Sequence, residues 1–319
     1  VDVPVLNNGG NYNISEAARL WVNGGSAEKP NGTAIVPYGT IQLSGGTLDA
    51  PINSGITTRA NGNIVVSDGV MTVNQIRTSV NGPENIGGYT QSGGTVNVTG
   101  DNISTSYYAF SLTYPGNTFN MSGGTLRVAG ARTGANTGGI FIASDPGNQN
   151  VSGGTVIMEI SRNDNFKLSS RAPFWNVIMR KSAGTGTEVD LITGASGTGG
   201  NVTNIVNPDL HVLNDLTIEN GVTFDHNGND VTIGSDFIIQ STGDYVYDTG
   251  KPNTTSFVGS DNAILRFLNR TGGSEDEQQF WNVLIDRPTN KEILLESGKS
   301  NVSGNNNNLF RIEGDFLKV

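Results

Sequence analysis

The stretch Phe119-Asn120-Met121-Ser122-Gly123-Gly124-Thr125-Leu126-Arg127-Val128 decides the fold of this chain. Apolar and polar residues alternate on both sides of the glycine pair, which is typical of strands that bury one face. The paired glycines permit positive φ and a sharp corner where a Cβ would clash. The stretch therefore predicts a strand, a glycine corner and a second strand.

This Ser-Gly-Gly-Thr corner recurs through the first half of the chain. Further copies begin at Ser44, Ser92 and Ser152, so that successive copies are 48, 30 and 30 residues apart. A degenerate copy at Ser67–Val70 divides the first interval into 23 and 25 residues, and a relic at Asn23–Ser26 precedes it. Repeats of this length are typical of a solenoid, in which each unit buries its apolar face by stacking on its neighbours.

The second half of the chain carries a different repeat. Phe174-Trp175-Asn176-Val177-Ile178-Met179 recurs 106 residues later as Phe280-Trp281-Asn282-Val283-Leu284-Ile285. Three-residue strands such as Leu216-Thr217-Ile218 follow, separated by Asn, Gly and Asp turns. We expect residues 1–170 to form a right-handed parallel β-helix with glycine corners. We expect residues 171–319 to form a second β-rich segment, either β-helical or an antiparallel β-sandwich.

Helical segments are nearly absent, since only residues 15–20 and 275–279 are compatible with one helical turn. The chain opens on Val1-Asp2-Val3-Pro4 and stops at Phe316-Leu317-Lys318-Val319, in the middle of the second repeat pattern. We therefore expect it to be an excerpt from a longer repetitive polypeptide.

Composition excludes several classes of protein. The chain has 319 residues with 44 glycines, no cysteine and a net charge of −10. Without cysteine there are no disulfides and no thiolate metal sites. An acidic chain without a Lys/Arg patch does not fit a nucleic-acid partner, and no apolar run approaches the ~18 residues of a spanning helix. We expect no nucleic-acid partner and no membrane insertion.

The two histidines are weak candidates for catalysis. His211 stands between Leu210 and Val212 on the polar face of an alternating run, which predicts a side chain in solvent. His226 stands in an Asp/Asn/Gly-rich stretch that predicts a turn. The HExxH, GxSxG and P-loop patterns do not occur in the sequence.

Carboxylates are the stronger catalytic candidates, because stacked strands ~4.8 Å apart can place two of them within reach of one glycosidic bond. The candidates are Asp225, Asp230, Asp236, Asp244 and Asp248, with Tyr245 and Tyr247 as the nearby aromatic residues. Aspartate at turns also serves its own backbone. We favour this structural interpretation.

Other candidate sites are weaker. Asn61–Asn63 and Asn305–Asn308 contain oxygen donors for calcium but no DxDxDG loop or nonapeptide repeat. Gly194–Gly200 lacks the lysine of a phosphate loop and predicts a turn. Trp21, with the tryptophans of the two Phe-Trp-Asn motifs, is a candidate platform for sugar stacking, and in each motif we expect one aromatic residue inside and the other outside. We expect no catalytic residue, no cofactor and no metal.

The glycine corners, the Phe-Trp-Asn openings and the Leu216-Thr217-Ile218-x-x-Gly221 strand resemble the very large repetitive surface adhesins of Bacteroidota. The matching residues are Phe174, Asn176, Val177, Ile178, Leu216, Ile218 and Gly221, then Phe280, Asn282, Val283 and Ile285. The resemblance covers most of residues 119–319. It implies export by the type IX system, gliding motility in some species, a cell-surface location and no catalytic residues.

These observations lead us to expect a non-enzymatic structural or adhesive segment of an extracellular bacterial surface fibre. Its expected partners are surface glycans or a substratum, and the secretion and motility machinery. Two alternatives stay open at this point: a β-helical polysaccharide lyase or hydrolase, and a segment of a phage tail fibre.

Overall fold

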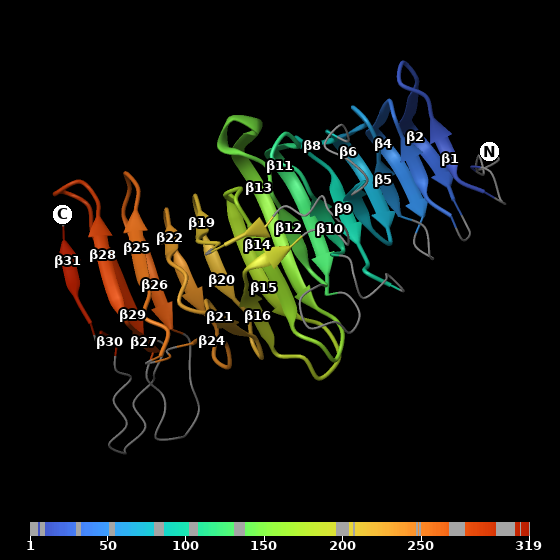
Figure 1. Cartoon of the computed structure of the whole chain (residues 1–319). Helices are drawn as coiled ribbons and strands as arrows, with labels where there is room; N and C mark the ends of the chain where they lie inside the picture. The colour runs from blue at the N-terminus through green and yellow to red at the C-terminus, as the bar shows by residue number, and fades with distance from the viewer. Residues whose placement is uncertain are drawn as a thin grey trace.

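The computed structural model of the chain is all-β, with long parallel sheets whose strands succeed one another along one axis from the N- to the C-terminus (Figure 1). It describes residues 6, 10–29, 33–50, 55–79, 86–101, 108–130, 138–195, 204–206, 208–246, 248, 250–267, 278–297, 310–312 and 314–318. In these residues the helical structure is one 3₁₀ turn, η1 (Pro146–Asn148). The expected helical turn at residues 15–20 is a tight turn that leads into a strand, and residues 275–277 lie outside the described residues.

The largest sheet has twelve strands. They are β2 (Arg19–Glu28), β4 (Thr40–Ala50), β6 (Asn63–Val73), β8 (Gly88–Gln91), β9 (Thr95–Val98), β11 (Thr118–Ala129), β13 (Gln149–Ile160), β15 (Asn176–Lys181), β20 (Leu216–Ile218), β23 (Phe237–Ile239), β26 (Ala263–Phe267) and β29 (Ile293–Ser297).

A second sheet has ten strands and a third has five. The ten are β1 (Tyr12–Ile14), β3 (Ile35–Pro37), β5 (Ile56–Thr58), β7 (Ile76–Thr78), β10 (Phe110–Leu112), β12 (Ile140–Ile142), β14 (Phe166–Ser170), β16 (Glu188–Leu191), β21 (Thr223–Asp225) and β24 (Asp244–Tyr245). The five are β19 (Leu210–Val212), β22 (Val231–Ile233), β25 (Thr254–Val258), β28 (Asn282–Asp286) and β31 (Phe316–Lys318). Two small sheets pair β17 (Gly194–Ala195) with β18 (Asn204–Ile205) and β27 (Gln278–Phe280) with β30 (Phe310–Ile312).

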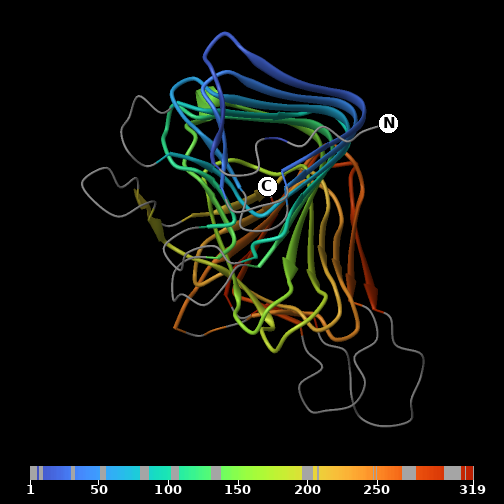
Figure 2. The same cartoon turned by 90° about the vertical axis from the view of Figure 1, so that its right-hand side faces the viewer.

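Consecutive strands pass from one sheet to the next, and we call one passage around the sheets a circuit. Up to β16 the chain alternates between the twelve- and ten-stranded sheets, and from β19 it also visits the five-stranded sheet. Seen along the stack, the circuits overlie one another (Figure 2). The pairings between described strands are parallel except for β17–β18, so the expected antiparallel β-sandwich is wrong for the described part of the second half.

The glycine corners are stacked in register. The threonine of each Ser-Gly-Gly-Thr copy pairs with the equivalent residue of the next circuit, for example Thr125 with both Thr95 and Thr155. The corners at Ser44, Ser122 and Ser152 lie at register shifts inside the long strands β4, β11 and β13, whereas residues 92–94 separate β8 from β9. The second glycine of every copy has positive φ, including +73° at Gly46 and +75° at Gly124. The corners of these four copies need glycine because the backbone of the preceding circuit lies directly beside them.

The five-stranded sheet continues the part of the long strands that precedes the corner. β15 pairs only with residues 155–160 of β13, which follow its corner. Phe174 bridges to Val212 in β19, and its ring packs against that of Phe119, which precedes the corner of β11, with centroids 6.2 Å apart. After residue 174 the corner between these two faces is made by short Asn-, Asp- and Gly-containing connections between separate strands.

The two Phe-Trp-Asn motifs occupy different sheets. Asn176 begins β15 in the twelve-stranded sheet, whereas Asn282 begins β28 in the five-stranded sheet. Their local pairing is nevertheless alike, because Val177 pairs with Leu216 as Val283 pairs with Phe316. Each motif thus repeats its contacts with the next circuit, but the second is displaced by one face around the axis.

One continuous column of apolar side chains fills the interior from Leu6 to Val283. Gln91 is a polar exception, at the inward position that Val66 and Met121 occupy in the two neighbouring circuits. Its Oε1 accepts a hydrogen bond from the Tyr89 hydroxyl at 2.8 Å, and its Nε2 donates to the Thr125 carbonyl at 3.1 Å. Burial raises the pKa of Tyr89 well above its usual value. The core tolerates the buried amide of Gln91 because its oxygen and nitrogen both have hydrogen-bond partners.

We predict that corner glycines differ in their tolerance of alanine. A Cβ at Gly46 would overlap with the carbonyl oxygen of Gly25 at a φ of +73°, whereas Gly24 has φ of +88° and open space around it. Gly24→Ala should lower the free energy of unfolding by about 1 kcal/mol through the left-handed backbone alone, and Gly46→Ala by clearly more.

Gly147→Ala is the control, because Gly147 has open space and no positive φ. Its effect on urea unfolding should stay within about 0.5 kcal/mol of wild type. Equal midpoints for Gly46→Ala and Gly147→Ala would contradict the packing of the corners.

Candidate functional site

Asp236, one of the predicted carboxylates, supports the backbone of the next circuit. Its Oδ1 accepts a hydrogen bond from the Ile264 amide at 2.8 Å. Its own amide donates to Asp215 Oδ1 at 3.1 Å, and the Asp215 amide donates to Asn176 Oδ1 at 3.3 Å. Asn, Asp and Asp therefore form a ladder along the corner that precedes the twelve-stranded sheet.

Asp230 belongs to a second ladder of the same kind. Its Oδ1 accepts from the Thr254 amide at 2.7 Å, and its amide donates to Asp209 Oδ1 at 3.0 Å. Farther along the same corner, Asn282 Oδ1 accepts from the Asp315 amide at 2.8 Å. The asparagines of both Phe-Trp-Asn motifs thus do the same work, which explains why this residue recurs with the motif.

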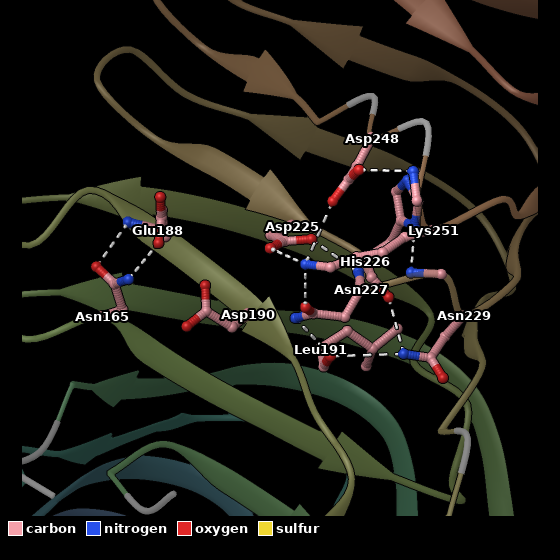
Figure 3. A network of polar contacts seen from close by, with 12 residues as sticks. Asn165, Glu188, Asp190, Leu191, Asp225, His226, Asn227, Asn229, Asp248 and Lys251 are labelled. Atoms are coloured by element: carbon pink, nitrogen blue, oxygen red, sulfur yellow. Dashed lines mark hydrogen bonds and ion pairs between the residues drawn. The ribbon is translucent and has the colours of Figure 1, made fainter. Parts of the chain in front are cut away.

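Asp225 is a predicted carboxylate that lies on a strand beside a strand carrying another acidic residue (Figure 3). It is in register with Asp190 on the outer face of the ten-stranded sheet. Lys167 forms an ion pair with Asp190, and Lys251 Nζ lies 3.4 Å from Asp225 Oδ2. Each carboxylate of the pair therefore has a lysine partner.

Hydrogen bonds around this pair also join successive circuits (Figure 3). Asn165 bonds to the Glu188 side chain and accepts from the Glu188 amide at 3.3 Å. Asn227 Nδ2 donates to the Leu191 carbonyl at 3.1 Å, while Lys251 Nζ donates to Asn227 Oδ1 at 2.8 Å. The cluster links the circuits that contain β14, β16 and β21 with the turn that precedes β25.

Only one carboxylate oxygen of the Asp190–Asp225 pair is without a hydrogen-bond donor among the described residues. Asp190 Oδ1 is buried and has no hydrogen-bond partner within the described part of the chain, and its side chain is 7% exposed. The other oxygen of Asp190 and both oxygens of Asp225 are used by lysine or backbone donors. No group of three His, Cys, Asp or Glu residues that could hold a metal occurs among the described residues.

Of the last two predicted carboxylates, Asp248 shares the Lys251 ammonium with Asp225 (Figure 3). Asp248 accepts from the Gly250 amide at 2.8 Å and lies 3.7 Å from Lys251 Nζ, so it organises its own turn. Asp244 lies in β24 beside Thr223. The structure does not gather Asp225, Asp230, Asp236, Asp244 and Asp248 around one space.

His226 begins a turn, as predicted, because Asn227 and Gly228 have positive φ of 52° and 80°. The residue is only 2% exposed, so this turn buries the imidazole, which the sequence did not indicate. The Gly228 amide donates to Nδ1 at 3.0 Å, and the ring lies 5.2 Å from that of Tyr245. Burial lowers the pKa of His226, and it outweighs the opposing effects of the hydrogen bond that the ring donates to the Val246 backbone and of the nearby aspartates. His211 is exposed, as predicted.

Tyr245, the candidate aromatic residue that the structure describes, does not line a sugar cleft. Tyr245 is buried, and its hydroxyl bonds to Thr255 Oγ1 at 2.7 Å and to Asn253 Nδ2 at 2.9 Å. Burial raises the pKa of Tyr245 far above its usual value despite these two bonds. Tyr247 lies outside the described residues. Tyr245 is therefore not available as an exposed aromatic residue beside the carboxylates.

The tryptophans do not form one platform. Trp21 is 56% exposed, and its Nε1 donates to Ser44 Oγ at 2.7 Å. Phe174 and Phe280 are fully buried while Trp175 and Trp281 are half-buried, which confirms the expected inside and outside members. Trp21 in β2 is six strands from β15 in the twelve-stranded sheet, or about 29 Å at the usual strand spacing.

Other predicted positions have structural places. Asn63 begins β6 and its Nδ2 donates to the Asn61 carbonyl at 2.7 Å. Gly194 begins β17, so the predicted turn starts with a short strand, and residues 196–200 lie outside the described residues. Residues 305–308 also lie outside them.

Sequence reasoning missed Asp190, Lys167 and Glu188. These residues stand in the alternating runs Phe166-Lys167-Leu168 and Glu188-Val189-Asp190-Leu191. The alternation could have predicted that their side chains point outward from a strand. The separations of 23 residues from Lys167 to Asp190 and 35 from Asp190 to Asp225 follow from the register of the strands. No repeated motif marks that register in this region.

We predict that Asp236→Ala lowers the free energy of unfolding by about 1 kcal/mol, because the Ile264 amide loses its acceptor. Asp236→Asn keeps Oδ1 and should lose less than half of that amount. Urea unfolding at pH 7 measures both variants. Equal losses for alanine and asparagine would show that charge, and not the hydrogen bond, is what matters at this corner.

We also predict that His226 makes the fold sensitive to acid. Its pKa is lowered in the folded state, so below about pH 6.5 the unfolded chain binds a proton that the folded chain does not. Stability should fall as the pH drops below 6.5 and level off beneath the lowered pKa. Urea midpoints between pH 8 and 5 should vary less in His226→Gln than in wild type. His211→Gln, at an exposed histidine, should leave the wild-type slope unchanged, and a slope shared by all three proteins would refute the assignment.

Comparison with known proteins gives no relative from which a site could be transferred. No protein-family model, no curated protein and no solved structure matches this chain. Among the described residues there is also no helix of the length and apolar character needed to cross a membrane.

Proposed function

We propose that this chain is a non-catalytic structural and adhesive segment of an extracellular bacterial surface fibre, built as a right-handed parallel β-helix. The observation that carries this proposal is the direction of the polar contacts. Asn, Asp and Lys side chains such as Asn176, Asp230 and Lys251 bond to the adjacent circuit. They serve continuity along the axis.

The β-helical assignment has two supports. Consecutive strands return to the same parallel sheet after one circuit, in the order β2, β4, β6 and onward. Parallel crossovers are right-handed in about 98% of cases, because a right-twisted strand packs back onto its sheet only in that hand. A right-handed solenoid is therefore the interpretation we adopt.

A mechanical role follows from this arrangement. Each interior circuit is bonded to two neighbours by backbone ladders and packs into one apolar column. Stability in such an array is approximately a sum of local and nearest-neighbour contributions. A load applied along the axis is shared by the parallel ladders of the three large sheets, and the strands inside each of these sheets are paired on both sides.

The adhesin family enters the proposal through the sequence motifs. The glycine corners and the Phe-Trp-Asn openings resemble the Bacteroidota surface adhesins, which implies a cell-surface location. It also implies partners among surface glycans, a substratum, and the secretion and motility machinery. Immunolabelling of intact cells of the source organism would test the location, and labelling only after permeabilisation would contradict it.

A polysaccharide lyase or hydrolase is the second candidate, favoured by one observation. Asp190 and Asp225 lie in register on adjacent strands, and Asp190 Oδ1 is buried without a partner. Two carboxylates at such a spacing are the minimum for acid-base hydrolysis of a glycoside. Their lysine partners favour the structural interpretation.

We predict no turnover when the protein is incubated with a panel of acidic and neutral polysaccharides, assayed by new reducing ends and by unsaturated products. Turnover that disappears in Asp225→Asn but persists in Asp248→Asn would instead establish the enzymatic alternative. Light scattering after size exclusion should give a monomer, and a stable trimer would favour a phage tail fibre.

A further inference from the structure

A hollow of about 250 Å³ opens on the outer face of the twelve-stranded sheet, where β9, β11, β13 and β15 end. It is lined by Thr99, Asp101, Arg127, Ala129, Glu159, Ser161, Arg162 and Ser182. None of these residues belongs to the Asp190–Asp225 cluster, which lies on the ten-stranded sheet. The hollow is a separate feature of the molecule.

Its shape follows from the register of the strands. Ala129 in β11 pairs with Glu159 in β13, and Thr99 directly follows β9 in the circuit before. Ala129 is 3% exposed but is not part of the apolar core. A methyl group between two longer side chains leaves a recess, so Ala129 forms its floor.

A fixed carboxylate stands in the recess. Glu159 is joined to Arg127 by two hydrogen bonds of 2.5 Å and to Ser182 Oγ by a third of 2.5 Å. Burial alone would raise the pKa of Glu159, but these bonds and the charges of Arg127 and Arg180 outweigh it and lower the pKa below its usual value. Glu159 is therefore ionised near neutral pH and can only accept hydrogen bonds.

The rim of the hollow carries an ion pair and one hydroxyl group without a hydrogen-bond partner among the described residues. Arg162 forms an ion pair with Asp101, and both side chains are 43% exposed. The Thr99 hydroxyl is buried and has no hydrogen-bond partner in the described part of the chain. A buried hydroxyl without a partner costs free energy that a ligand hydroxyl can recover.

The charge balance defines the class of ligand. Two guanidinium groups and two carboxylates cancel, so neither an anion nor a cation finds a net opposite charge in the lining. Acceptors at Glu159 and Asp101, donors at the arginines and three hydroxyls suit a neutral molecule rich in hydroxyl groups. The volume lies just below the ~300–1,000 Å³ of pockets for drug-sized ligands, which suits a single ring.

We propose that this hollow binds one residue of a neutral sugar, and thereby supplies a glycan contact for the adhesive segment. The inference rests on the proposed function, since it names the ligand class that such a segment would contact.

Saturation-transfer NMR tests this with the methyl glycosides of glucose, galactose, mannose and N-acetylglucosamine, and with glucuronate and glucosamine as charged comparisons. At least one neutral glycoside should bind, and more strongly than either charged sugar. Ala129→Leu fills the recess and should abolish that binding. Thr125→Leu, an outward position of the same strand outside the lining, should leave it unchanged.

Thr99→Val keeps the shape of the side chain and removes no native hydrogen bond, so it should fold normally. It should weaken binding about fivefold, the effect of one hydrogen bond.

Binding of glucuronate alone, no binding of any neutral glycoside, or full binding by a folded Ala129→Leu variant would each overturn the inference. Protein-coated beads that still adhere to a glycan surface with Ala129→Leu would overturn this site and leave the proposed function standing. Polysaccharide turnover would overturn the proposed function itself.

Discussion

The parallel ladder between circuits is the constraint on which the rest of this structure depends. Neighbouring strands lie about 4.8 Å apart, so each side chain meets its counterpart in the next circuit at that distance. At a corner the closest neighbour is the backbone of the preceding circuit, as it is for Gly46 beside Gly25. Two solutions are used here. One is glycine, which has no side chain to clash with the neighbouring backbone. The other is Asn or Asp, whose side-chain oxygen accepts a hydrogen bond from a backbone amide of the neighbouring circuit.

The change from the first solution to the second accompanies the change in circuit shape. Before residue 174, one long strand such as β11 bends through its glycine pair and serves two faces. Afterwards, separate strands such as β19 and β20 serve the two faces, and Asp215 stands between them. Arg287 adds to this second type of corner. Arg287 is 4% exposed, and its Nη2 donates a hydrogen bond of 2.9 Å to the carbonyl of Gly234. Gly234 follows β22, which lies two circuits before β28 in the five-stranded sheet.

Much of this fold could be predicted because the constraint is local and leaves a mark in the sequence. The alternation around Ser122–Thr125 defines inward and outward faces, and the spacing of the copies follows the register of the described circuits. The displacement of the second Phe-Trp-Asn motif could not be predicted, since it depends on how many faces the intervening circuits visit. The partners of Asp225 were missed for the same reason. Asp190 and Lys167 are near it only through register, whereas Asp230 and Asp236 resemble Asp225 in sequence and bond to the backbone instead. His226 was half predicted, because turn residues reveal its backbone but not the burial of its ring.

Because the second Phe-Trp-Asn motif is displaced by one face, the two motifs place their tryptophans on different sides of the molecule. Trp175 stands at the corner between the five- and twelve-stranded sheets, and Trp281 at the corner between β27 and the five-stranded sheet. Two near-identical sequences are thus presented in different radial directions. A flat surface pressed against one side of the molecule would meet only one of these tryptophans, whereas a mesh of chains surrounding it would meet both.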